Sequence, residues 1–525
     1  MNNNKIKTGV DDNSETQMLE QYDYIVVGAG SAGCVITRRL IDSAKATVLL
    51  LEAGGDYNEI ETVTNPMQWL NNIGAANDYF YQYQPSPLLN DRVISAPRGK
   101  QLGGSGSINA LVWARGNQAD YNNWAAAGNR GWDYESVLPF FKKIEDWEGG
   151  ENSFHGVKGP IHVETAKNIH PVGQALIDAG VSFGLPFLED TNGPNPEGVG
   201  AMSMNTLNGK RCSPFRGYLQ PVLNNPMLSV LKNAQVLNLI IEGTHCTGVE
   251  FLYEGKKVSI KASKEVILSA GTFETPRILM LSGIGPQTEL KGLGIQSKID
   301  LPGVGKNLQD HPLIASVCFE ANEAMGSPTH NLLGSAVYAK SSKGKDHADL
   351  MIIPAQAALV SPEIGSKYPL PENAFSLLPT LVKVKSRGFL KISSAAYDAP
   401  LIIQPNFLSD SDDMEAMVSA VELCLALAAE PTFKKLIKKN IVPEKLGSYA
   451  ELVGFIKNAC QTYFHPIGTC GMGNGIDAVV DNQLKVHGID GLRIADASIM
   501  PQITTGNTNA PTMMIAEFAT QLLLA

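Results

Sequence analysis

Tyr24-Ile25-Val26-Val27-Gly28-Ala29-Gly30-Ser31-Ala32-Gly33 is the stretch that decides the fold, because it carries an apolar run directly into the pattern G-x-G-x-x-G. A helix is expected from Cys34 to Ser43, and a second apolar strand from Thr47 to Leu51 ends at Glu52. In such a unit the glycines allow a tight turn, a close backbone approach to a pyrophosphate and close packing of helix on strand. The stretch therefore predicts a dinucleotide-binding unit rather than an ordinary strand-turn-helix.

The fingerprint also predicts which residues meet the dinucleotide. The pyrophosphate is expected at the helix N-terminus. The residues expected there are Gly28, Gly30, Ser31, Ala32 and Gly33. Glu52 lies 19 residues beyond Gly33, where its carboxylate can accept hydrogen bonds from a ribose diol.

Composition limits the kinds of protein that this chain can be. Its 525 residues exceed one ordinary core, so two or more packed units are expected. A formal net charge of −10, without a run of lysine or arginine, argues against a nucleic-acid partner. No segment reaches the roughly 18 continuous apolar residues that a membrane span needs. Residues 1–21 lack the apolar stretch of a signal peptide and are expected to form a disordered tail.

The cysteines and histidines predict neither a disulfide framework nor a metal site. The seven cysteines are scattered, odd in number and without a C-x-x-C pair, which favours free thiols in a reducing cytoplasm. The nine histidines have no metal-ligand spacing such as H-E-x-x-H. We therefore expect a cytoplasmic protein without a bound metal.

Later segments carry further signals of a nucleotide domain. The glycine- and serine-rich run 96–109 is interpreted as a ligand-gripping loop, because a basic pair opens it and an apolar run follows it. A helical pattern covers Asn123 to Trp147. Strands are expected at 228–231, 248–251, 265–269 and 492–496, a short helix at 276–285, and a C-terminal helix from about 510.

The central part of the chain has a different character. Between 313 and 455 we find strand-like runs at 388–392 and 401–404 and a helix near 414–429, without a nucleotide fingerprint. We predict an α/β fold with a Rossmann-like dinucleotide-binding domain assembled from 22–160, 200–312 and 460–525. An inserted α+β substrate-binding domain, containing an antiparallel sheet, is predicted for 161–199 and 313–459.

Several further motifs follow the opening fingerprint in a fixed order. They are Leu51-Glu52-Ala53-Gly54-Gly55, the loop 98–109, the run 271–285, the segment 303–311 ending at His311, His465-Pro466-Ile467-Gly468-Thr469-Cys470, and Gly506-Asn507-Thr508-Asn509-Ala510-Pro511-Thr512. Over almost the whole chain, from about Tyr22 to Ala525, these motifs resemble the glucose-methanol-choline family of flavin-dependent alcohol oxidoreductases. The resemblance implies that the dinucleotide is FAD rather than NAD.

The resemblance also implies positions along FAD. Val236 is implied to meet the adenine through its backbone, and Asp496 and Ala497 to lie near the phosphates and the ribityl chain. The residues implied along the isoalloxazine edge are Ser107, Asn109, Ala110 and Leu111. The remaining implied cofactor-binding residues are Ala53, Arg98, Gly103, Gly104 and Ala270.

The two C-terminal motifs carry the implied reactive groups. In family members a histidine and, 44 residues later, a histidine or asparagine face the flavin ring, which here gives His465 and Asn509. A neutral imidazole with a pKa of about 6.5 can take the hydroxyl proton of an alcohol. An amide can donate a hydrogen bond to that oxygen as it gains alkoxide character. His465 is therefore the expected base and Asn509 the expected donor, whereas Asn507 and His311 are expected to be structural.

Two departures from the family pattern concern the cofactor and the substrate. Some members tether FAD covalently through a histidine before the loop asparagine, but Ile108 stands there, so non-covalent FAD is expected. Choline-oxidising members can carry a glutamate where this chain has Leu313, and Phe464 lies beside His465. The resemblance therefore implies an uncharged primary alcohol, aromatic or aliphatic, although an aromatic cage alone can still bind a cation.

The expected reaction is oxidation of that alcohol to the aldehyde, with hydride transfer to flavin N5. The electron acceptor stays open between oxygen and a quinone or carrier protein. The alternatives are choline dehydrogenase-type activity, a hydroxynitrile lyase on the same scaffold, and an NAD-dependent dehydrogenase. Flavin that does not bleach under anaerobic alcohol would favour the lyase, and a colourless protein would favour the NAD enzyme.

Overall fold

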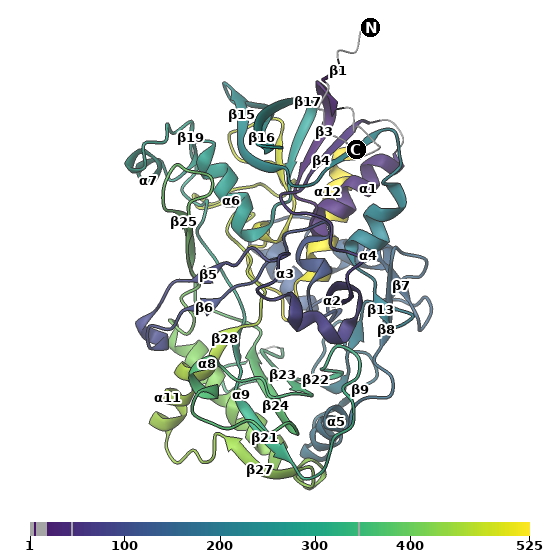
Figure 1. Ribbon diagram of the computed structural model, residues 1–525, viewed down its shortest axis with the longest axis vertical. Coiled ribbons are helices and arrows are strands. Elements are labelled where there is room, and N and C mark those ends of the chain that lie inside the picture. The colour runs from purple at the N-terminus through teal and green to yellow at the C-terminus, as the bar shows by residue number, and fades with distance from the viewer. Residues whose placement is uncertain (1–4, 7–17, 44–45, 345–346) are drawn as a thin grey trace.

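Two large sheets organise the computed structural model, which describes residues 5–6, 18–43, 46–344 and 347–525. A seven-stranded sheet lies in the upper part of Figure 1 and a nine-stranded sheet in the lower part. Helices and strands are mixed in both parts. The predicted α/β fold with an antiparallel second sheet is confirmed.

The seven-stranded sheet is assembled from distant parts of the chain. Its order is β14-β4-β3-β17-β16-β15, and β29 also pairs with β17. Its strands are β3 (Gln21–Val27), β4 (Val48–Leu51), β14 (Leu228–Leu231), β15 (Gln235–Glu242), β16 (His245–Tyr253), β17 (Lys256–Leu268) and β29 (Leu492–Ile494). The pairings among β14, β4, β3, β17 and β29 are parallel. All four residues of β4 are buried, which explains why its sequence is a continuous apolar run.

Glycines determine how the fingerprint packs. α1 (Ser31–Asp42) follows β3 through Gly28, whose φ is +95°. A Cβ on Gly33 would lie 1.8 Å from the carbonyl oxygen of Gly28, so only glycine lets the helix start this close to the turn. A Cβ on Gly104 would lie 2.7 Å from Cα of Gly30. The loop 96–109 is therefore pressed against the fingerprint turn.

The nine-stranded sheet forms the second layer. Its order is β27-β21-β24-β23-β22-β10-β9, and β20 joins β24 to β28. Its strands are β9 (Phe187–Leu188), β10 (Gly198–Ala201), β20 (Pro312–Ile314), β21 (Val317–Ala321), β22 (Ser335–Ala339), β23 (Leu350–Ala355), β24 (Ala374–Leu381), β27 (Ile437–Val442) and β28 (Cys460–Thr462). All of its pairings except β9 with β10 are antiparallel. The helices α5 (Pro171–Phe183) and α9 (Ser411–Ala429) pack on it.

The remaining helices and helical turns are spread along the chain. The other helices are α2 (Glu61–Thr64), α3 (Gln118–Ala126), α4 (Tyr134–Ile144), α6 (Gly271–Leu281), α7 (Gln287–Gly292), α8 (Pro362–Gly365), α10 (Pro431–Lys434), α11 (Tyr449–Ala459) and α12 (Asn509–Leu524). The short helical turns are η1 (Pro66–Asn72), η2 (Pro87–Leu89), η3 (Gly104–Ser107), η4 (Phe215–Leu219), η5 (Gln220–Val222) and η6 (Ala497–Ile499).

The remaining strands form small sheets. They are β1 (Lys5–Ile6), β2 (Met18–Leu19), β5 (Gln82–Tyr83), β6 (Ile94–Ser95), β7 (Glu145–Trp147), β8 (Ile161–Thr165), β11 (Ser203–Met204), β12 (Thr206–Leu207), β13 (Lys210–Arg211), β18 (Ile284–Gly285), β19 (Ile299–Asp300), β25 (Phe389–Ile392) and β26 (Leu401–Gln404). β25 and β26 form a separate two-stranded sheet.

The helical pattern expected from Asn123 to Trp147 is divided between two helices, and its last three residues form a strand. The segment contains the end of α3, the whole of α4 and then β7. Gly128 and Gly131 have positive φ between the helices, and Asp133 caps α4 by accepting a hydrogen bond from the Ser136 amide at 3.1 Å. The two glycines therefore end one helix, and the aspartate starts the next.

The helix expected at 276–285 begins earlier and ends sooner, as α6. Pro276 is inside its first two turns, and Gly283 lies just beyond its end with φ +84°. Of the tail expected at 1–21, residues 18–19 form β2 and Gln21 opens β3, whereas 1–4 and 7–17 lie outside the described residues.

Candidate functional site

A cavity of about 450 Å³ lies where the two sheets meet. Its upper wall is formed by the fingerprint turn, the loop 96–109, the start of α6 and the segments that follow β29, and its lower wall by β20, β23, β24 and β28. Of the predicted cofactor residues, those that line it are Gly28, Gly30, Ser31, Ala32, Glu52, Ala53, Arg98, Gly104, Asn109, Ala110, Leu111, Val236, Ala270, Asp496 and Ala497. The cavity therefore gathers residues that are hundreds of positions apart in the sequence.

Three predicted cofactor residues lie behind the cavity wall. Gly33 packs against Gly28 as described above. The Gly103 amide donates a hydrogen bond to the Ala29 carbonyl at 2.7 Å, and the Ser107 hydroxyl donates to Oδ1 of Asn58 at 2.9 Å. These residues shape the backbone that surrounds the cavity rather than its surface.

Glu52 stands where the fingerprint predicts its carboxylate. Its two oxygens accept hydrogen bonds from the amides of Ala29 and Gly54, each at 2.9 Å. Burial raises the pKa of Glu52 to about 7, against the opposing effect of these hydrogen bonds. A ribose hydroxyl that donated to this carboxylate would relieve part of the cost of its burial.

Asp496 accepts hydrogen bonds from two separate segments of the chain. Its carboxylate accepts from the Gly271 amide at 2.8 Å and from the Thr275 hydroxyl at 2.6 Å, both in α6. It also accepts from the Ser498 amide at 2.8 Å. Burial raises the pKa of Asp496. The carboxylate thus holds α6 and the segment after β29 together at the cavity wall.

Arg211, which was not predicted from the sequence, supports the cavity from behind. Its guanidinium donates to Oδ1 and to the carbonyl of Asn109, both at 2.7 Å, and to the Val63 carbonyl at 2.7 Å. Burial lowers the pKa of Arg211 to about 9. Nothing in the spacing of the sequence links Arg211 to Asn109, because the pair is formed only by the fold.

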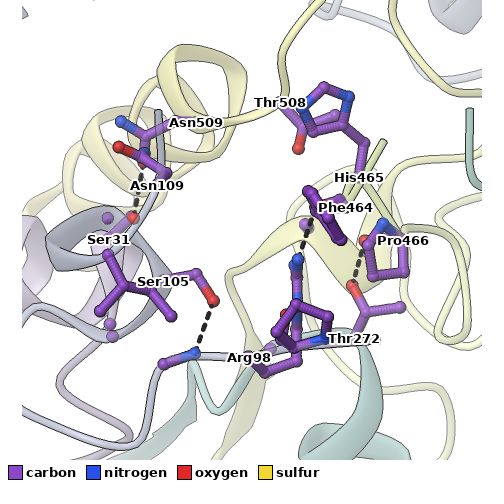
Figure 2. Close-up of a pocket in the computed structure, with 18 of the residues that line it drawn as sticks. Ser31, Arg98, Ser105, Asn109, Thr272, Phe464, His465, Pro466, Thr508 and Asn509 are labelled. Atoms are coloured by element: carbon purple, nitrogen blue, oxygen red, sulfur yellow. Dashed lines mark hydrogen bonds between the residues drawn. The ribbon is translucent and has the colours of Figure 1, made fainter. Parts of the chain in front are cut away.

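His465 lies at the opposite end of the cavity from the fingerprint, as Figure 2 shows. It follows β28 and the strained residue Phe464, whose φ is +67°. Its backbone amide donates to Oδ1 of Asp310 at 2.8 Å. Burial lowers the pKa of His465 well below its usual value, and His311 and Arg98 act in the same direction. The imidazole is therefore neutral in the resting protein.

The structure does not bring His465 and Asn509 together. Asn509 opens α12, and its Oδ1 accepts a hydrogen bond from the Ser31 hydroxyl at 2.7 Å. In Figure 2 it lies beside Asn109 and Ser31, across the cavity from His465. Its Nδ2 is buried without a hydrogen-bond partner among the described residues.

Asn507, which we expected only to order its loop, is the asparagine that meets the histidine. Its Nδ2 lies 3.1 Å from Nε2 of His465. Asn507 precedes α12, whereas Asn509 is its first residue. Their side chains therefore contact different partners, His465 for Asn507 and Ser31 for Asn509. Pro511 carried the missed signal, since proline is favoured in the first turn of a helix and thus marks Asn509 as helical.

His311, also expected to be structural, is the second neighbour of His465. The Nδ1 atoms of the two rings lie 3.0 Å apart, and the rings meet edge to face. The ring of His311 is completely buried. His465 is therefore held between Asn507 at one ring nitrogen and His311 at the other.

The lower part of the cavity is apolar. Its buried walls include Val112, Leu313, Leu333, Ile353, Leu378 and Tyr463. In the described part of the chain, the cavity-lining carboxylates are Glu52, Glu274 and Asp496, none of which lies on the nine-stranded sheet. Within the described part of the chain, the hydroxyl of Tyr463 and Oδ1 of Asn507 are buried without a well-formed hydrogen bond. A ligand here would meet apolar walls and a few polar atoms near His465.

These observations fit FAD in the upper part of the cavity. A Cβ on Gly28 would lie 2.6 Å from the Ser269 carbonyl oxygen and one on Gly104 2.7 Å from Cα of Gly30, so both glycines are needed for the backbone to pack this closely. A Cβ on Gly30 would meet no protein atom within 4 Å, so the backbone at Gly30 faces open space that a phosphate can approach. The unpaired Nδ2 of Asn509 offers a donor on the same side. The described ranges contain no group of three or more His, Cys, Asp or Glu side chains that could hold a metal ion, and no helix long and apolar enough to cross a membrane.

Comparison with known proteins gives a consistent result. Two family models, both described as GMC oxidoreductase, match residues 22–313 and 384–516. Mitochondrial choline dehydrogenase of Mus musculus is 36% identical over 96% of this chain and 89% of its own length. Alcohol dehydrogenase [acceptor] of Pseudomonas putida is also 36% identical, over 96% of both chains.

Solved structures show the same relationship. Pyridoxine 4-oxidase from Mesorbium loti superimposes with a TM-score of 0.91 at 32% identity, covering 95% of this chain and 98% of that one. A formate oxidase superimposes with a TM-score of 0.88 at 26% identity, covering 96% and 98% of the two chains. The fold is therefore shared along nearly the whole chain.

Proposed function

Because the chain belongs to the GMC oxidoreductase family of FAD-dependent, alcohol-oxidising enzymes, we propose that it oxidises an uncharged primary alcohol to the aldehyde. The observation that carries this proposal is the buried, neutral His465 at the meeting point of an apolar chamber and the cofactor cradle. FAD, when bound, supplies the hydride acceptor. We place FAD in the upper part of the cavity, against the predicted residues that line it.

His465 and Asn507 form a matched pair for a hydroxyl group. In the free protein Nδ2 of Asn507 donates to Nε2 of His465 at 3.1 Å. A hydroxyl both donates and accepts, so a substrate oxygen can donate its proton to Nε2 and accept from Nδ2 at once. His465 then removes the proton as hydride leaves the carbinol carbon, and Asn507 stabilises the oxygen as it gains negative charge.

Asn507 therefore replaces Asn509 in this proposal as the hydrogen-bond donor to the substrate. Asn509 is assigned instead to the cofactor side, since it shares a hydrogen bond with Ser31 of the fingerprint. Its unpaired Nδ2 is then available to the flavin. Both asparagines thus have a role, but with different partners.

Further proposals concern the domains, the location and the electron acceptor. We propose the domain boundaries given above, with β20 and β28 pairing near two of the junctions at 312 and 460. We also propose a cytoplasmic location, which the seven free, buried cysteines support. The electrons pass to oxygen or to a quinone or carrier, and peroxide formation during aerobic turnover distinguishes these acceptors.

We expect FAD to be bound without a covalent link. Ile108 lines the cavity where a tethering histidine would stand, and an alkyl side chain cannot form that bond. His465 is the cavity-lining histidine among the described residues. Acid precipitation should therefore release all of the yellow colour into the supernatant, and colour retained in the pellet would contradict the expectation.

A cationic alcohol is the second candidate, because choline dehydrogenases are among the relatives. We nevertheless expect 3,3-dimethylbutan-1-ol, the uncharged isostere of choline, to reduce the flavin faster than choline. Leu313 and its apolar neighbours offer no counter-charge, and a desolvated cation without one is costly. Benzyl alcohol and pyridoxine extend the anaerobic bleaching assay to aromatic alcohols.

The pair of isosteres controls for shape, since only the charge differs between them. Choline reducing the flavin faster than its isostere would overturn the uncharged-substrate proposal. Flavin that none of these alcohols bleaches, together with cleavage of a cyanohydrin, would support the lyase alternative instead.

A further inference from the structure

His311 and His465 are in direct contact although 154 positions separate them in the sequence. Their Nδ1 atoms lie 3.0 Å apart, and their ring planes meet at 90°. The antiparallel pairing of β20 with β28 sets this contact, because Pro312 lies opposite Thr462 in the register. Asp310 reinforces it, since its Oδ1 accepts the backbone amides of both His311 and His465 at 2.8 Å.

Both imidazoles are neutral at neutral pH. Burial lowers the pKa of His311 to about 3. Burial also lowers the pKa of His465 well below its usual value. A hydrogen bond between two neutral imidazoles needs one Nδ1 to carry the proton and the other to accept it. The contact therefore has a direction, and that direction decides which nitrogen of His465 is basic.

Asn507 determines the direction. Its Nδ2 faces Nε2 of His465, and an amide nitrogen can only donate, so this Nε2 must carry a lone pair. The proton of His465 is then on Nδ1, which donates to Nδ1 of His311. His311 in turn carries its proton on Nε2, which is buried without a well-formed hydrogen bond among the described residues, while the backbone of Val382 and Thr504 acts to raise the pKa of the ring.

We propose that His311 is a positioning residue that fixes His465 in the tautomer whose Nε2 accepts the proton of the alcohol. This inference rests on the proposed function and deepens it, since it states what makes His465 a base at the correct atom. A histidine whose second nitrogen is hydrogen-bonded has its tautomer set by that bond.

The same contact supports His465 after proton transfer. The O–H bond of the alcohol breaks and the proton forms a bond with Nε2, so His465 becomes an imidazolium that still donates from Nδ1 to His311. That hydrogen bond is then charge-assisted and roughly twice as strong as a neutral one. The other groups near the ring are Arg98, Tyr463 and Asp310. The positive charge of Arg98 disfavours the imidazolium. The carboxylate of Asp310 already accepts hydrogen bonds from backbone amides and from the hydroxyls of Tyr83 and Thr462.

The test compares two substitutions of nearly equal shape. His311→Asn places its Oδ1 where Nδ1 of the histidine was, so it keeps an acceptor, whereas His311→Leu removes it. We expect His311→Leu to reduce the flavin roughly 10²-fold more slowly at saturating alcohol, and His311→Asn to stay within about tenfold of wild type. FAD affinity and Tm should be alike in the two variants.

A second readout does not depend on turnover. The ¹⁵N NMR spectrum of protein labelled with ¹⁵N-histidine reports the tautomer of each ring. The His465 signals are identified by their loss in His465→Ala. They should show an unprotonated Nε2 in wild type and in His311→Asn. In His311→Leu the proton should move to Nε2. The pH profile of flavin reduction should retain its inflection in His311→Asn and lose it in His311→Leu.

An unchanged tautomer of His465 and an unchanged rate of flavin reduction in His311→Leu would overturn the proposal. Equal slowing of flavin reduction in His311→Leu and His311→Asn would also overturn it, because it would indicate that the ring acts only by packing. Failure of the proposed function looks different. In that case His465→Ala itself would reduce the flavin normally, while the tautomer measurement would still report on the contact with His311.

Discussion

His465→Ala is expected to slow reduction of the bound flavin by a primary alcohol by roughly 10²–10⁴-fold, the usual contribution of a general base. Nε2 of His465 is the basic atom at the apolar end of the cavity, and alanine leaves no replacement for it. FAD should still bind, because the hydrogen bonds that hold Glu52 and the fingerprint turn do not involve His465. Rapid mixing with alcohol under anaerobic conditions measures the reduction rate directly.

The wild-type rate should also depend on pH. Burial lowers the pKa of His465, and His311 and Arg98 act in the same direction, so the neutral base persists below the usual histidine pKa of about 6.5. The rate should therefore be flat from pH 9 down through 6.5, and fall only as the pH drops through the lowered pKa. His465→Ala should lack this acidic limb.

Two outcomes would contradict the role of base. Near-wild-type reduction in His465→Ala would remove the residue from the mechanism. A wild-type rate that rises on acidification would indicate that the imidazolium acts as an electrostatic stabiliser rather than as a proton acceptor. FAD content measured in parallel separates both outcomes from a loss of cofactor.

The upper half of the molecule was predictable because its signals are local. The β3–α1–β4 unit follows from a continuous apolar run, a glycine pattern and a second apolar run, all within about thirty residues of sequence. Gly28 and Gly33 are required by backbone geometry inside that same unit. Where the geometry is local, the sequence contains nearly all of the information.

The environment of His465 was less predictable because non-local pairing creates it. His311 reaches His465 only through the register between β20 and β28, and Arg211 reaches Asn109 across 102 positions. The exchange of roles that we propose between Asn507 and Asn509 depends on where α12 begins, because Asn507 precedes the helix and Asn509 is its first residue. Motif spacing identified the loop but could not orient the residues within it.

Asn507→Ala is expected to slow flavin reduction by roughly 10²–10³-fold, the usual cost of losing one donor to a developing oxyanion. Its Nδ2 is the donor nearest to Nε2 of His465, so it is placed to bind the same substrate oxygen. The effect should be smaller than that of His465→Ala because the proton acceptor remains. FAD affinity should change little, since Asn507 contacts the histidine rather than the fingerprint.

Asn509→Ala is the matched control, because it removes the same side chain two residues away. Its partner is Ser31 at the start of α1, so its loss should weaken FAD binding by roughly 3–10-fold, as expected for one net hydrogen bond. At saturating FAD its reduction rate should approach that of wild type. Asn507→Ala should therefore change mainly the rate of flavin reduction, and Asn509→Ala mainly the affinity for FAD. The reverse pattern would restore the assignment made from motif spacing, in which Asn509 binds the substrate oxygen.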